Sequence, residues 1–226
     1  MSLSRPVAEA IEEARPAAVR IPSVAEPHAL YFVSKRTIDL LLGLVFLLLA
    51  APVILVAALA IAVTMRAWPF FSQMRVGEGG REFRMFKICS MLPGSDAVIP
   101  LHLNISGGPT FKSDADPRVT RVGRIIRRTS IDELPQLLNV VLGNMSLVGP
   151  RPALPREVIQ YPEEAYIRLS VKPGLTCFWQ TQGRSLLQFD EWMRLDRQYV
   201  ETRSLGMDLK LLLRTPLALI SMKGAY

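Results

Sequence analysis

The chain has 226 residues, which allows one ordinary domain plus a membrane element and leaves little room for two full domains. Its formal net charge of +7 favours phosphorylated partners such as an anionic leaflet, a nucleotide or a nucleic acid. The two cysteines, Cys89 and Cys177, lie far apart and fit neither a zinc spacing nor a redox pair. The glycines at 77, 79 and 80 lack the lysine-serine tail of a P-loop, so the pattern argues against Walker-type sites as well.

Residues 1–30 contain four prolines among alanines and glutamates and show no sustained apolar period. Such a composition cannot bury enough apolar surface to fold alone. The sequence therefore predicts a flexible N-terminal tail over residues 1–30.

From Leu40 to Met65 the chain carries no charge, and this stretch is long enough to enter a bilayer. Pro52 lies at its midpoint and removes a backbone donor there. Each arm of about 12 residues, or roughly 18 Å of helix, is too short to cross about 30 Å of hydrocarbon alone. Basic residues stand on both sides, which is compatible with a segment that enters and returns. The residues alone nevertheless favour a kinked spanning helix, because prolines are tolerated in membrane helices.

The rest of the chain shows four further segments. Phe70 to Ile88 has strand-like pieces around a glycine-rich turn, and residues 93–117 have the composition of a long loop. Arginines line one side of the helical projection from Arg118 to Arg128, which predicts a basic amphipathic helix. Leu209 to Met222 is a second apolar segment, equally compatible with an interfacial helix and with a buried core helix.

Two adjacent carboxylates, Asp132 and Glu133, stand in the run Ser-Ile-Asp-Glu-Leu-Pro that starts at Ser130. By spacing alone the favoured interpretation is helix capping, since Ser130 and Glu133 fit a capping box. The alternative is catalysis: a helix N-terminus favours the ionised carboxylate, the form required of a nucleophile or a metal ligand. A neighbouring carboxylate could then hold Mg²⁺ together with substrate phosphates.

Three basic residues are candidates for binding phosphate. Arg151 stands between two prolines that restrict its backbone, and a fixed guanidinium suits bidentate phosphate binding. Arg184 follows a glycine, and Lys87 shares a face of an alternating stretch with apolar neighbours. For Lys87, a lysine snorkelling at the membrane boundary is the competing interpretation. The arginines from Arg118 to Arg128 are interpreted mostly as a solvated face or as contacts to lipid headgroups.

Several ordered motifs resemble the bacterial sugar transferases, the monotopic phosphoglycosyl transferases that load a sugar phosphate onto polyprenyl phosphate. The likeness covers roughly residues 31–226. The motifs are Lys35-Arg36-Thr37-Ile38-Asp39, Phe86-Lys87, Asp116-Pro117-Arg118-Val119-Thr120, Arg127 with Thr129 to Gln136, Val148-Gly149-Pro150-Arg151-Pro152, Lys172-Pro173-Gly174-Leu175-Thr176, and Gly183-Arg184.

The resemblance implies a reaction. Asp132 would attack a UDP-sugar to give an aspartyl phosphosugar and UMP, and undecaprenyl phosphate would then accept the sugar phosphate. Glu133 would assist Mg²⁺ binding. The implied phosphate-binding residues are Lys87, Arg127, Arg151 and Arg184.

The resemblance also implies a mixed, mostly helical α/β fold at the bacterial inner membrane. A re-entrant helix over residues 31–67, broken at Pro52, would precede a cytoplasmic catalytic domain over residues 68–226. The implied partners are a UDP-sugar, undecaprenyl phosphate and membrane lipid, with no nucleic acid; a homodimer is left open.

Trp179-Gln180 and the terminal Gly-Ala-Tyr are similar to members that transfer glucose or galactose 1-phosphate to begin exopolysaccharide synthesis. Cys177 stands where the family commonly has glycine, which weakens any inference about the sugar. Two rival functions remain at this level: a membrane-bound Mg²⁺-dependent phosphatase, and a non-catalytic membrane-tethered basic scaffold.

Overall fold

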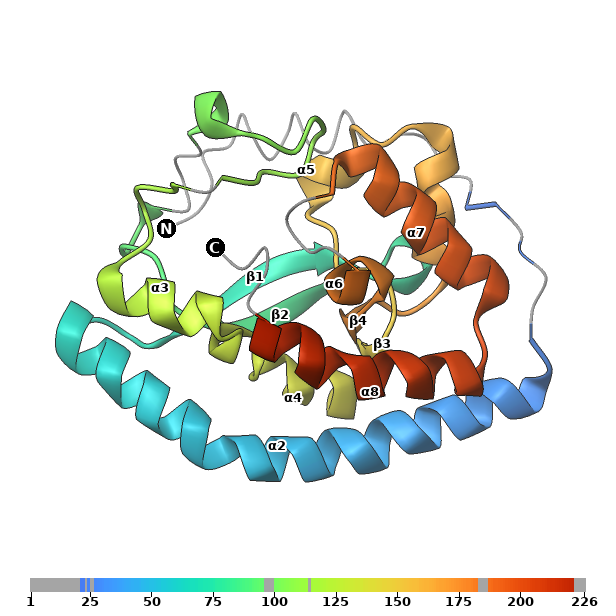
Figure 1. Cartoon of the computed structure of the whole chain (residues 1–226), viewed down its shortest axis with the longest axis horizontal. Coiled ribbons are helices and arrows are strands. Elements are labelled where there is room, and N and C mark those ends of the chain that lie inside the picture. The colour runs from blue at the N-terminus through green and yellow to red at the C-terminus, as the bar shows by residue number, and fades with distance from the viewer. Residues whose placement is uncertain are drawn as a thin grey trace.

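The computed structural model describes residues 21–22, 24, 27–95, 100–113, 115–182 and 187–221. Most of the expected tail, and Arg184, lie outside this set. The described part combines helices with two small two-stranded sheets, as expected for a mixed and mostly helical chain (Figure 1).

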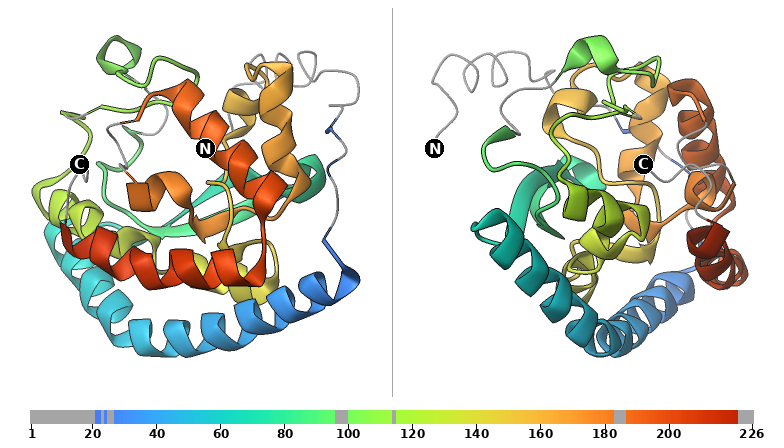
Figure 2. Two further views of the ribbon diagram at one scale, coloured as in Figure 1. Left: turned by 45° about the vertical axis from the view of Figure 1, so that its right-hand side comes forward. Right: turned by 60° about the vertical axis from the view of Figure 1, so that its left-hand side comes forward.

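A single helix, α2 (Ala29–Met65), holds the whole apolar segment. It is long and apolar enough to cross a membrane, and only 17% of its most apolar window is buried against the protein. The resemblance implied a break at Pro52, whereas helical structure continues through that residue. A proline removes one hydrogen bond, and a helix can absorb this loss as curvature. Figures 1 and 2 show α2 as a bow along one side of the molecule.

Both arms of α2 are fastened to the rest of the chain. Near its start, Arg36 donates hydrogen bonds of 2.8 Å to the carbonyls of Val140 and of Val141. Near its end, Ile61 is fully buried in a cluster with Ile88 and other apolar residues. The two ends of the apolar segment therefore contact one and the same folded body.

The first sheet is the hairpin of β1 (Phe70–Val76) and β2 (Glu82–Ile88), joined by the turn η1 (Glu78–Gly80). The expected strands around a glycine-rich turn are thus confirmed. The register pairs Phe71 with Lys87 and Arg75 with Phe83. Because residues two apart share a face of a strand, Arg75 and Lys87 project from the same face of the hairpin.

The second sheet pairs β3 (Ser146–Val148) in parallel with β4 (Gly174–Thr176). The main core, around Met145, Leu147 and Val200, lies between this sheet, the hairpin and the helices. The remaining elements are η3 (Leu101–Leu103), α3 (Arg121–Arg128), η4 (Ile131–Glu133), α4 (Gln136–Leu142), α5 (Pro155–Val158), η5 (Glu163–Ser170), α6 (Phe178–Gln182), α7 (Phe189–Thr202) and α8 (Leu205–Ser221).

Helix α3 bears out the expected basic amphipathic helix over Arg121–Arg128, and α8 shows that the second apolar segment is not a fully buried core helix. Leu211 of α8 is buried, whereas Leu209, Leu213 and Leu217 are more than half exposed. Figure 1 places α8 beside α2. A helix with one apolar face in the core and another uncovered is suited to lie at a membrane interface.

Replacing Gly174 with alanine is expected to lower the free energy of unfolding by about 3 kcal/mol, because the new methyl group would overpack the second sheet. A Cβ at this position would lie 2.0 Å from the amide nitrogen of Gly149, which is backbone and cannot swing aside. Denaturant unfolding in lipid nanodiscs measures the loss. Gly206→Ala is the matched control: a Cβ there meets nothing within 4 Å, so stability should be unchanged or slightly increased. Equal stability of both variants would contradict the expectation.

Candidate active site

Asp132 and Glu133 lie on the short turn η4 between α3 and α4. The turn forms because Ser130 takes a left-handed conformation (φ 57°) directly after α3. Ser130 makes no side-chain capping bond, and α4 begins only at Gln136, with Pro135 before it. The favoured capping interpretation was therefore wrong, and both carboxylates remain available for chemistry.

Lys87 joins the two carboxylates. Its Nζ lies 2.8 Å from Oε1 of Glu133 and 3.6 Å from Oδ2 of Asp132. The lysine side chain is only 18% exposed, so it does not snorkel at a membrane boundary. Strand β2 and turn η4 thus bring Lys87 to two adjacent carboxylates that follow it by more than 40 positions in the chain.

The environment shifts the pKa values of the two carboxylates in opposite directions. Burial raises the pKa of Asp132, and the neighbouring Glu133 adds to this, while Lys87 and Arg127 act in the opposite direction. Burial also acts to raise the pKa of Glu133, but the charge and hydrogen bond of Lys87, together with the charges of Arg151 and Arg75, hold that pKa below its ordinary value. Glu133 is therefore the more strongly ionised partner, and Asp132 the more basic one.

A cavity with about 360 Å³ of empty space, part of it open to solvent, lies beside this cluster. Lys87, Glu133 and Arg151 line it together. Arg151 comes from the loop after β3, so the structure brings this predicted phosphate ligand to the carboxylates. Arg127 is placed differently: its charge lowers the pKa of Asp132, but it is not among the residues that line the cavity.

Two further polar residues in the cavity wall were not predicted. Arg75 is 5% exposed, and its Nη1 donates to the carbonyl of Pro152 at 2.9 Å. Burial, followed by the charge of Arg151, lowers the pKa of Arg75 to about 9. Gln136 is 3% exposed, and its Nε2 has no hydrogen-bond partner in the described part of the chain. A signal for Arg75 was present in the sequence, because strand alternation places it on the face that also carries Lys87.

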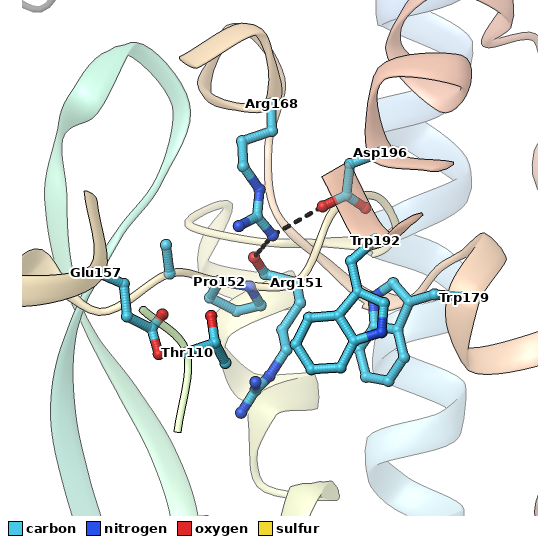
Figure 3. A pocket seen from close by; sticks show the side chains of 9 residues that line it. Thr110, Arg151, Pro152, Glu157, Arg168, Trp179, Trp192 and Asp196 are labelled. Carbon is cyan, nitrogen blue, oxygen red and sulfur yellow. Dashed lines mark hydrogen bonds and ion pairs between the residues drawn. The ribbon is translucent and has the colours of Figure 1, made fainter. Parts of the chain in front are cut away.

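A second, smaller cavity shares Arg151, Pro152 and Trp179 with the first (Figure 3). The rings of Trp179 and Trp192 lie 5.2 Å apart on its wall. Trp179, noted in the sequence for its likeness to hexose transferases, therefore lies where the two cavities meet.

Cys177 lines the first cavity and is 3% exposed. Burial raises the pKa of its thiol well above the ordinary value. The thiol is thus neutral at physiological pH and forms part of the wall rather than a nucleophile.

The donor set suits a magnesium ion that is shared with substrate. Among the described residues no group of three or more histidines, cysteines, aspartates or glutamates is assembled to hold a metal. Mg²⁺ commonly takes one or two protein carboxylates and completes its shell with water and substrate phosphates. Asp132 and Glu133 beside a cationic cavity meet this requirement.

Known proteins resemble the chain over most of its length. The family model described as "Bacterial sugar transferase" matches residues 30–222. The chain is 38% identical over 199 residues to an undecaprenyl-phosphate galactose phosphotransferase of Salmonella typhimurium, covering 85% of this chain and 41% of the relative. It is 36% identical over 199 residues to the exopolysaccharide production protein ExoY of Rhizobium meliloti, covering 85% and 88%.

A third relative is a UDP-glucose:undecaprenyl-phosphate glucose-1-phosphate transferase of Caulobacter vibrioides, 40% identical over 210 residues, with 88% of this chain and 74% of the relative covered. The chain thus spans less than half of the Salmonella protein and most of the Rhizobium one. The family-model match over residues 30–222 includes nearly all of α2 and every residue that lines the first cavity.

Proposed function

The chain belongs to the bacterial sugar transferase family, and on that premise we propose that it transfers a hexose 1-phosphate from a UDP-sugar to undecaprenyl phosphate, releasing UMP. The observation that carries the proposal is the cluster of Asp132, Glu133 and Lys87 beside Arg151. A buried carboxylate with a raised pKa is a stronger nucleophile than an exposed one, and fixed cations can stabilise charge on transferring phosphoryl oxygens.

In the first half-reaction, a carboxylate oxygen of Asp132 attacks the phosphorus that bears the sugar. The bond from this phosphorus to the bridging oxygen of the diphosphate breaks, and UMP leaves with the electron pair. The intermediate is an aspartyl phosphosugar. Lys87 and Arg151 neutralise the phosphoryl oxygens, and Arg127 contributes positive charge from the end of α3.

In the second half-reaction, a phosphate oxygen of undecaprenyl phosphate attacks the same phosphorus. The bond to Asp132 breaks, and the carboxylate returns to its starting form. The product is undecaprenyl diphosphate hexose, and the order of events is ping-pong. Among relatives, the printed names include galactose and glucose transferases and an exopolysaccharide production protein, so we assign glucose or galactose as the donor sugar and exopolysaccharide initiation as the setting.

Glu133 is the residue that would hold Mg²⁺ in this scheme, because its lowered pKa keeps it ionised. The ion would supply charge neutralisation to the diphosphate. Arg184 is proposed as a further phosphate ligand only by its place in the family motif.

We further place α2 as a re-entrant helix of the bacterial inner membrane, with both ends and the catalytic part on the cytoplasmic face. The support is that Arg36 near one end and Ile61 near the other both pack on the same folded body. A helix that spanned the bilayer would place these two ends on opposite sides of the hydrocarbon, where a single folded body could not contact both.

Topology can be measured by introducing single cysteines at His28 and at Ala67 in a protein carrying Cys89→Ala and Cys177→Ala. A membrane-impermeant maleimide is expected to label both positions only when it has access to the cytoplasmic face. Labelling of one position from each side would show a spanning helix and overturn the assignment.

The activity is tested by incubating the protein in nanodiscs with Mg²⁺, undecaprenyl phosphate and single UDP-sugars. UMP release that requires the lipid supports the proposal, and the donor that is consumed identifies the sugar. Release of UDP would indicate an ordinary glycosyltransferase. Phosphate release without lipid would indicate the phosphatase alternative, and absence of turnover with every donor would favour the scaffold.

A further inference from the structure

Two buried arginines hold the backbone of the loop that carries Arg151. Arg168, on η5, donates from Nη2 to the carbonyl of Arg151 at 2.9 Å, and Arg75, on β1, donates from Nη1 to the carbonyl of Pro152 at 2.9 Å. The two side chains are 6% and 5% exposed. Two successive peptide groups are therefore fixed from two different elements.

Arg168 is itself held rigidly. Its Nη2 lies 2.8 Å from Oδ2 of Asp196, and its Nη1 donates to the hydroxyl of Tyr161. The guanidinium also lies over the Tyr161 ring, 5.4 Å from its centroid. Figure 3 shows the Arg168 head group between Asp196 and the Arg151 carbonyl, with the Arg151 side chain extending in the opposite direction.

From this geometry we infer that Arg168 is a positioning residue for the phosphate-binding side chain of Arg151, an inference that rests on the proposed function. A hydrogen bond to a carbonyl fixes the plane of the peptide group, and this plane sets the direction in which the side chain leaves the backbone. Charge-assisted hydrogen bonds from a planar guanidinium are strong and directional. The ion pair with Asp196 keeps the donor from turning away.

Arg168 acts through Arg151 rather than on substrate. It lines the smaller cavity and is absent from the wall of the cavity beside Asp132 and Glu133. Its guanidinium is engaged by the Arg151 carbonyl, Tyr161 and Asp196. Arg75 is different, because it lines the catalytic cavity and could also contact phosphate directly.

A double-mutant cycle separates positioning from general stability. Arg168→Lys is expected to lower kcat/KM for the UDP-sugar about 10- to 100-fold, the cost of a misplaced catalytic group. In an Arg151→Ala background the same change should cost less than about twofold, because there is no guanidinium left to position. If Arg168→Lys lowered kcat/KM by the same 10- to 100-fold factor in both backgrounds, the inference would be overturned.

Two variants control for folding. Tyr161→Phe removes only the hydroxyl that accepts from Arg168, and it should show the same dependence on Arg151 with a smaller loss. Arg36→Lys disrupts a comparable pair of arginine hydrogen bonds, those to the carbonyls of Val140 and Val141. None of these three residues lines either cavity. The effect of Arg36→Lys on kcat/KM should be equal with and without the Arg151 side chain.

Hydrogen exchange of peptides covering residues 149–154 gives a readout that requires no substrate. Arg168→Lys is expected to raise exchange there, and Arg36→Lys is not. Unchanged exchange in the Arg168 variant would overturn the inference even if no donor were turned over. Raised exchange without wild-type turnover would instead locate the failure in the proposed function.

Discussion

Replacing Asp132 with asparagine is expected to reduce lipid-dependent UMP release by at least about 1,000-fold, because the amide cannot attack phosphorus. The side chain is nearly isosteric and Asp132 is only 8% exposed, so the fold should be retained. UMP formation in nanodiscs measures the loss. Mass spectrometry of the wild-type protein, quenched with donor and without lipid, should show a hexose phosphate on the peptide that contains Asp132, and the variant should show none.

Asp190→Asn is the matched control. Asp190 lies in the first turn of α7, is exposed and lines neither cavity. Its replacement should leave UMP release within about twofold of wild type, as expected for a surface change. An Asp132→Asn protein that still released UMP with lipid would exclude Asp132 as the nucleophile.

Replacing Lys87 with methionine is expected to lower kcat/KM about 100-fold at neutral pH and to move the acid limb of the pH profile upward. Asp132 must be ionised to attack, so activity is lost as pH falls through its pKa. Lys87 holds that pKa down against burial and against Glu133, so removing its charge raises the pKa further. The pH dependence of kcat/KM, measured in wild type and variant, reports the shift.

Arg84→Met provides the comparison within the same strand. Arg84 is exposed and projects from the opposite face of β2, so its replacement should leave the acid limb in place. A Lys87→Met profile with the wild-type acid limb would show that Lys87 does not control the ionisation of Asp132.

Local patterns predicted much of the fold. The uncharged stretch from Leu40 lies in α2, and the alternating segments around the glycines form the β1–β2 hairpin. The helical spacing of the arginines correctly predicted α3. Each of these signals is contained within a short window of sequence. A short window can also mislead, as it did for capping at Ser130. The local sequence fits a capping box, but the chain leaves α3 through a left-handed Ser130 and forms a separate turn.

The site was predicted in part. The family motifs named Asp132, Glu133, Lys87 and Arg151, and the structure brings all four to one cavity and its edge. Arg168 and Asp196 could not be predicted from spacing, because they reach the Arg151 loop only through long-range packing of η5 and α7. Arg75 is the exception, since alternation along the two strands places it on the face that carries Lys87.

The way α2 is attached makes this helix part of the folding unit. The Asp39 carboxylate accepts from the amide of Leu147 at 2.9 Å inside the core, and Lys35 pairs with Asp208 of α8 at 3.2 Å. Removing residues up to 67 would therefore not leave an intact core, since both polar contacts would lose a partner. With α2 in the lipid as proposed above, anything that draws it out would also open the protein interior, so bilayer thickness and composition would affect the free energy of unfolding.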